Sequence, residues 1–253
     1  MMIQFNEYLQ PLLRWIHIVA GIAWIGHLYF FNFVNANVMA VLDGDAKKKV
    51  VPELMPRALW WFRMGAVWTW ITGVLMLTLV FYHGGVQFES GDSWTVLAML
   101  LVAVTFLGVF VYDAIMKNIS NEKVAVAYLS ILLAVLYFFF FKFGHFSYRA
   151  SVIHVGTLFG TIMAFNVWFR IWPAQQKIIK AVKEGVAPDA ALVKLAGLRS
   201  KNNTYLSVPL VWTMINQHTY IFASSPYALL LIVALSWWVV SLLYKKSKTV
   251  KGF

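Results

Sequence analysis

The sequence contains no cysteine. Disulfides, thiolate metal sites and the covalent attachment of a c-type haem are therefore excluded within these residues. Charge is scarce as well: charged residues make up 12% of the 253 residues, whereas hydrophobic residues make up 61%. This composition is too apolar for a soluble domain of such length, and it is typical of an integral membrane protein.

Carboxylates are the scarcer of the two charges, with 10 acidic against 21 basic residues. None of the acidic residues falls inside a long hydrophobic stretch, and Asp113 stands only at the end of one. A carboxylate proton relay and a carboxylate-rich metal site within the membrane are therefore not expected. The first residues carry no basic segment, so we expect no cleavable signal peptide.

Seven hydrophobic stretches dominate the sequence, and a membrane-spanning helix needs about 20 mostly apolar residues. They predict an all-α fold: a polytopic integral membrane bundle of about seven transmembrane helices, forming one domain over residues 1–253. The predicted spans are Leu12–Val34, Phe62–Tyr82, Trp94–Tyr112, Val124–Phe141, Tyr148–Ile171, Tyr205–Phe222 and Tyr227–Tyr244. The sixth is short and contains Pro209, so six spans with a re-entrant sixth segment stay an alternative.

The basic residues predict the orientation of the bundle. Of the 21 lysines and arginines, 18 lie on the side opposite the N-terminus, so that side is expected to be cytoplasmic. The N-terminus is then outside and the C-terminus inside, in a bacterial inner membrane. The positive charge lies in loops between apolar spans, so the lipid bilayer is the expected partner and nucleic acid is not. The loop at 173–203 predicts two short amphipathic helices on the cytoplasmic face.

Histidine is the main polar residue type left inside the spans. His17, His154 and His218 are each predicted one to two turns below the outer surface, on three different spans. His27 is ten residues beyond His17 and therefore about 15 Å deeper. His83 and His145 lie in outer loops and are expected to be ordinary loop residues.

Two imidazoles at equal depth on different helices are what a bis-histidine haem b requires. His17 and His154 are therefore the predicted axial ligands, with His218 as a further ligand or as the catalytic proton acceptor. Copper or zinc on His17, His154, His218 and His27 is the alternative.

Other side chains would complete such a haem site. One helical turn and two turns beyond His17 stand Gly21 and Trp24, which would contact the macrocycle. Arg14 and Arg149 would pair with its propionates or with an anionic substrate. Gly156 and Gly160 form a G-x-x-x-G pattern that predicts close packing against another helix.

Three stretches of the chain carry a family resemblance. They are LRWIHIVAGIAWIGHLYFFNFVN (12–34), MPRALWWFRMGAVWTWITGVLML (55–77) and RSKNNTYLSVPLVWTMINQH (199–218). Together they resemble the membrane domain of the cytochrome c-type urate oxidases, the PuuD-like proteins. The resemblance implies a transmembrane bundle that oxidises urate to 5-hydroxyisourate and passes electrons to a cytochrome c domain. No Cys-x-x-Cys-His occurs here, so a separate periplasmic cytochrome or other electron carrier is expected.

The first hypothesis is thus a membrane oxidoreductase that takes electrons from a small substrate, or from quinol. Asn216 and Gln217, near His218, would help to bind a urate-like anion. A transporter or channel and a haem-handling assembly subunit are the alternatives, and a homo-oligomer stays open.

Overall fold

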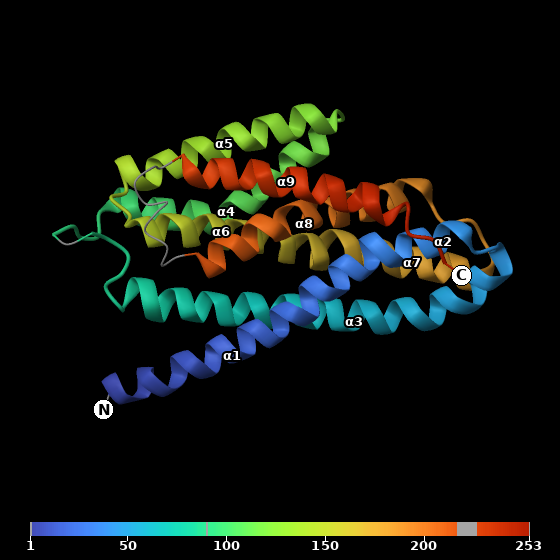
Figure 1. Cartoon of the computed structure of the whole chain (residues 1–253), viewed down its shortest axis with the longest axis horizontal. Coiled ribbons are helices and arrows are strands. Elements are labelled where there is room, and N and C mark those ends of the chain that lie inside the picture. The colour runs from blue at the N-terminus through green and yellow to red at the C-terminus, as the bar shows by residue number, and fades with distance from the viewer. Residues whose placement is uncertain (1, 90, 217–226, 253) are drawn as a thin grey trace.

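The computed structural model describes residues 2–89, 91–216 and 227–252 (Figure 1). In this part of the chain the regular elements are helices, and one isolated bridge joins Phe88 to Phe146. The α-helices are α1 (Met2–Tyr29), α2 (Ala36–Val41), α3 (Gly44–Leu77), α4 (Val96–Asn118), α5 (Glu122–Lys142), α6 (Tyr148–Asn166), α7 (Trp172–Glu184), α8 (Ala190–Ile215) and α9 (Ala228–Ser247). The all-α prediction is confirmed.

Side-chain caps explain where most of the long helices begin. The side chains that cap α3, α4 and α6 are Asp43, Thr95 and Ser147, and each accepts a hydrogen bond from a backbone N–H in the first turn. Such a cap satisfies one of the four amide groups that have no partner within the helix. At the C-terminal end of α7, Gly185 adopts a left-handed conformation (φ 73°), which ends the helix.

Six helical segments in the described residues are long and apolar enough to cross a membrane. They are Tyr8–Val41, Gly44–Tyr82, Val96–Asn118, Glu122–Lys142, Tyr148–Glu184 and Ala228–Ser247. The seventh long helix is α8, which lies along the others in Figure 1 and carries polar buried residues such as Asn203 and Ser207. The predicted sixth span begins inside α8, and its last six residues lie outside the described part of the chain.

Both halves of 173–203 contain helix, as predicted, but neither is a short, separate helix. The first half is most of α7, which continues from α6 through a π-helical segment. The second half is the beginning of α8, which starts at Ala190 rather than near Tyr205. Hydropathy marked only the apolar part of each helix. The polar turns remain helical because they pack against neighbouring helices.

Three short π-helical segments interrupt the regular α-helical geometry. They are η1 (Phe30–Asn35), η2 (Thr78–Tyr82) and η3 (Val167–Ile171). Hydropathy did not predict them, because the wider turn leaves the apolar composition unchanged. Such segments occur often at functional sites, since they redirect the side chains that follow.

Close helix packing depends on a few small residues. A Cβ at Gly156 would clash with the side chain of Thr213 on α8, whereas a Cβ at Gly160 would lie 3.9 Å from Leu210. The prediction that this G-x-x-x-G pattern packs against another helix is therefore confirmed. On α3, a Cβ at Gly65 would lie 2.8 Å from the backbone nitrogen of Trp24, so this glycine lets α1 approach α3.

Candidate functional site

His154 is fully buried near the start of α6. Its Nδ1 lies 2.7 Å from the carbonyl oxygen of Ala150, one turn earlier, and donates a hydrogen bond to it. The proton then resides on Nδ1, so Nε2 keeps its lone pair and accepts a hydrogen bond from the Tyr82 hydroxyl, 3.1 Å away. The rings of Phe140 and Phe146 lie 5.7 and 4.9 Å from the imidazole. His154 is therefore held in one orientation and one tautomer.

The π-helical segment η2 brings Tyr82 to this histidine. Tyr82 is the last residue of η2, and its ring also contacts Trp94. The π-helical geometry of η2 thus ends at Tyr82, the residue that hydrogen-bonds to the buried His154.

Several buried polar groups at this end of the bundle have no hydrogen-bond partner. Ser147 connects the start of α6 to the loop between η2 and α4: its N–H donates to the carbonyl of Gln87 (2.9 Å) and its hydroxyl to that of Val86 (2.8 Å). Among the described residues, the unpaired side-chain atoms here are the Gln87 amide, the Tyr137, Tyr148 and Ser151 hydroxyls and Arg149 Nε. A buried group without a partner costs about 1–3 kcal/mol, so this group of atoms is a candidate contact surface for a polar ligand.

His17 has a different environment on α1. Its Nδ1 lies 3.2 Å from Thr72 Oγ1 on α3, and the side chain is partly buried. The ring lies against Gly73, where an added Cβ would be 3.0 Å from Cε1. Gly73 therefore provides the space that this imidazole occupies.

The prediction that His17 and His154 share one depth is wrong. His17 contacts Thr72 and His154 contacts Tyr82, which lie ten residues apart on the helix formed by α3 and η2. At 1.5 Å per residue the two contact points are about 15 Å apart along that helix. The sequence prediction measured the depth of each histidine from the nearest arginine. This reference fails for His17, because α1 already begins at Met2, several turns before Arg14.

The remaining predicted residues on α1 face different surroundings. Arg14 is exposed, and Gly21 faces Thr69 of α3 at ordinary van der Waals distance. Trp24 is buried (1% exposed) in the contact between α1 and α3. His27 Nδ1 donates to the carbonyl of Ala23 at 2.7 Å. Gly21 and Trp24 therefore contribute to helix packing in this structure.

The predicted residues near the end of α8 are only partly described. Asn216 caps α8, and its side-chain amide donates to the carbonyl of Trp212 at 3.4 Å. Gln217 and His218 lie outside the described residues. Within the described part, no three His, Asp or Glu side chains form a group that could hold a metal ion. The copper or zinc site that includes His218 stays a prediction.

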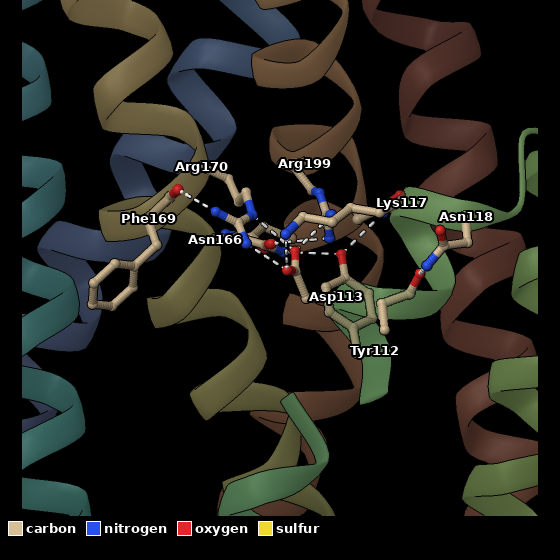
Figure 2. Close-up of polar contacts among 11 residues, drawn as sticks. Tyr112, Asp113, Lys117, Asn118, Asn166, Phe169, Arg170 and Arg199 are labelled. Carbon is tan, nitrogen blue, oxygen red and sulfur yellow. Dashed lines mark hydrogen bonds and ion pairs between the residues drawn. The ribbon is translucent and has the colours of Figure 1, made fainter. Parts of the chain in front are cut away.

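A second polar site lies at the opposite end of the bundle and was not predicted (Figure 2). Arg170 and Arg199 both donate to the carboxylate of Asp113, Arg170 through Nε (2.8 Å) and Nη2, and Arg199 through Nη2 at 2.8 Å. Lys117 adds a further ion pair at 2.9 Å. Asp113 and Arg199 are 6% and 1% exposed, so this is a buried ionic network.

Neutral side chains extend the ionic network across α4, α6 and α8. Asn166 donates to Asn203 Oδ1 (2.8 Å) and to the Tyr112 hydroxyl (3.0 Å), and its own oxygen lies 3.5 Å from Arg199 Nη1. Asn202 also donates to the Tyr112 hydroxyl, at 3.1 Å. Asn166 is twelve residues beyond His154 on α6, which separates the two sites by about 18 Å along the helix.

The sequence held a partial signal for this second site. Asp113 was recognised at the end of a span, but no partner was predicted for it. Arg199 begins the polar run RSKNN, which hydropathy excludes from a span. An arginine that is buried and paired cannot be distinguished by composition from one that is solvated, because the pairing is made by residues 57 and 86 positions away.

The fold and these two sites define a polytopic helical membrane protein with a buried polar site toward each end of its bundle. The chain matches the family described as urate oxidase N-terminal over residues 3–49 and 42–248. It therefore belongs to this family, as the resemblance in three stretches predicted. Comparison with curated proteins and with solved structures gave no match.

Proposed function

We propose that this protein is a membrane-bound oxidoreductase of the urate oxidase type. The observation that carries the proposal is the family match, which extends over nearly the whole chain. In the proposed reaction urate and water yield 5-hydroxyisourate, two protons and two electrons. The electrons pass to a separate carrier, such as a periplasmic cytochrome c.

His154 is the residue best suited to accept a proton in this reaction. Its Nδ1–H donates a hydrogen bond to the carbonyl of Ala150, so Nε2 is the nitrogen that can accept a proton. The Tyr82 hydroxyl, which now donates to Nε2, can be displaced by a substrate N–H. At the same end of the bundle, the unpaired groups of Gln87, Ser151 and Arg149 supply donors and an acceptor of the kind that a purine with several C=O and N–H groups requires.

Haem b is the cofactor that we propose for the electron-transfer step, to which it would supply one-electron chemistry. His17 and His154 each have a hydrogen-bonded Nδ1, the arrangement that directs Nε2 toward a ligand or metal. The separation of their contact points by about 15 Å along α3 and η2 does not fit axial ligation of one iron by both. We therefore assign His154 to proton transfer and assign no step to a haem on this pair.

The test is urate consumption by the purified protein, expressed with added haem and supplied with oxidised cytochrome c. We expect wild-type protein to remove the ultraviolet absorbance of urate, and His154→Ala to slow the reaction by about 10²–10⁴-fold, the usual contribution of a general base. His83→Ala is the matched control, because His83 is exposed in the loop that follows η2.

Two results would contradict the proposal. One is the absence of urate oxidation by wild-type protein with every electron acceptor supplied. The other is an unchanged rate in His154→Ala. A visible spectrum of wild type beside His17→Ala and His154→Ala tests the cofactor separately, because a Soret band reports haem whether or not urate reacts. Loss of the low-spin haem signal in both variants would show that the two histidines are axial ligands after all and would contradict the assignment of His154 to proton transfer alone.

A further inference from the structure

A cavity of about 700 Å³ lies among α4, α5, α6, α8 and α9. Its volume is within the range of small-molecule sites, which is about 300–1,000 Å³. The lining includes residues from Lys123 to Phe139 of α5, a length of about 24 Å along the helix. Nearly all of this lining is apolar, so the cavity has the length and character of a site for a hydrophobic chain.

One end of the cavity is polar and adjoins the ionic network. The side chains there are Tyr112, Asn202, Lys201, Glu122 and Lys123. Tyr112 is 4% exposed and stacks against the guanidinium of Arg199, whose carbon lies 5.1 Å from the ring centroid. The cavity therefore joins a long apolar space to a buried phenol.

The hydroxyl of Tyr112 has one unused hydrogen-bonding function. A phenol has one donor and two acceptor positions. Asn166 and Asn202 both donate to the oxygen, at 3.0 and 3.1 Å, which uses both acceptor positions. Within the described residues the phenolic proton has no acceptor, so Tyr112 can donate it to a carbonyl oxygen in the cavity.

The charged side chains at this end are two lysines and one glutamate. Lys201 pairs with Glu122 at 3.1 Å, so these two residues compensate each other. Lys123, the third charged residue of the cavity, has no ion pair with any residue that the structure describes, and it is exposed. An uncharged carbonyl needs no counterion at this end, since the Tyr112 hydroxyl can bind it by a single hydrogen bond, whereas an anionic lipid head group is the competing occupant that the test below includes.

We infer that this cavity binds an isoprenoid quinone, with a ring carbonyl at the Tyr112 hydroxyl and the tail along α5. The inference rests on the proposed redox function, because the quinone would be the separate electron carrier of that reaction in place of a cytochrome c. A quinone takes up two electrons and two protons on reduction to quinol, which matches the two of each released by urate oxidation.

The test is quinone binding, measured apart from turnover. Purified full-length protein in phosphatidylcholine nanodiscs is titrated with decylubiquinone, and quenching of tryptophan fluorescence is recorded; Trp237 lines the cavity. We expect saturable binding that is weakened about tenfold by Tyr112→Phe, which corresponds to about 1.4 kcal/mol for one lost hydrogen bond. Tyr205→Phe is the matched control, because Tyr205 lines the same cavity but its hydroxyl already bonds to Ser241 at 3.0 Å.

A second variant separates binding from folding. Val104 lies in the cavity wall and is 43% exposed, so Val104→Trp would fill the cavity without breaking a hydrogen bond. We expect it to abolish quinone binding while the thermal unfolding midpoint stays near that of wild type.

The outcomes distinguish this inference from the proposed function. Quinone binding without urate oxidation would support the cavity assignment and count against the urate reaction. Urate oxidation without saturable quinone binding would overturn the cavity assignment alone. Equal affinity in wild type and Val104→Trp, or displacement of the quinone by phosphatidylglycerol at low molar ratio, would also overturn it, since the second result identifies the cavity as a lipid site.

Discussion

At the scale of single residues, the buried ionic network restricts most strongly which amino acids can stand at its positions. Asp113 is the carboxylate shared by Arg170 and Arg199, and Arg199 is almost fully buried. Removing one partner of a buried pair leaves a charge that water cannot reach, which costs more than the pair itself contributes. Asp113 is therefore expected to be far less replaceable than an acidic residue on the surface.

Asp113→Asn should lower the free energy of unfolding by roughly 3–5 kcal/mol, because two guanidinium groups lose their counterion. The measurement is thermal unfolding followed by circular dichroism in detergent, together with the yield of monodisperse protein. Glu53→Gln is the control: Glu53 also pairs with an arginine, but both side chains are more than two-thirds exposed, so no measurable change is expected. Equal unfolding midpoints for the two variants would show that Asp113 is not a required counterion.

At the scale of helices, α6 connects the two polar sites. It carries His154 in its first half and Asn166 at its last position, and its buried residues pack on α4 and α8. The π-helical segments η2 and η3 lie beside these sites, with Tyr82 ending η2 and Arg170 within η3. The positions of the functional side chains thus depend on local departures from α-helical geometry as well as on helix packing.

Gly156→Ala should destabilise the contact between α6 and α8, because the added methyl group would overlap the Thr213 side chain. The expected loss is about 1–3 kcal/mol, the usual cost of overpacking, and is measured by the same thermal unfolding. Gly160→Ala is the matched control, since its methyl group would meet Leu210 at ordinary contact distance. If both variants unfold at the wild-type temperature, α6 and α8 do not pack as closely as the structure shows.

At the scale of the whole molecule, six apolar helical segments and the more polar α8 form one bundle, drawn in Figure 1. The orientation of this bundle in the membrane is a prediction from 18 of 21 basic residues on one side. The absence of cysteine makes that prediction directly testable, since any introduced thiol is the only one in the chain.

Asp92→Cys and Val186→Cys should report opposite sides of the membrane. Both positions are exposed, the first in the loop after η2 and the second in the turn between α7 and α8. The measurement uses spheroplasts of a bacterial expression host. A membrane-impermeant maleimide should label the cysteine at position 92 at once and the cysteine at position 186 only after lysis. The reverse pattern would show that the N-terminus is cytoplasmic. The cysteine-free wild type provides the blank.

The sequence alone was sufficient for the class of the protein. Long apolar runs determine that it is an all-helical membrane bundle, because an unsatisfied backbone amide is too costly in lipid for any other open structure. Three stretches around 12–34, 55–77 and 199–218 predicted the family, and the G-x-x-x-G at Gly156 predicted a helix contact. These features are local, so each can be recognised within a short segment.

Only the tertiary structure decided how the polar side chains are grouped. His17 and His154 were expected to face each other, yet one contacts Thr72 and the other Tyr82. Asp113 was noted only as the end of a span and no partner was predicted for it, yet Asp113, Arg170 and Arg199 form one buried network. The physical reason is that these groupings depend on which helices are neighbours, on their relative shift and on single π turns. Composition and periodicity, which report on one helix at a time, contain none of these three quantities.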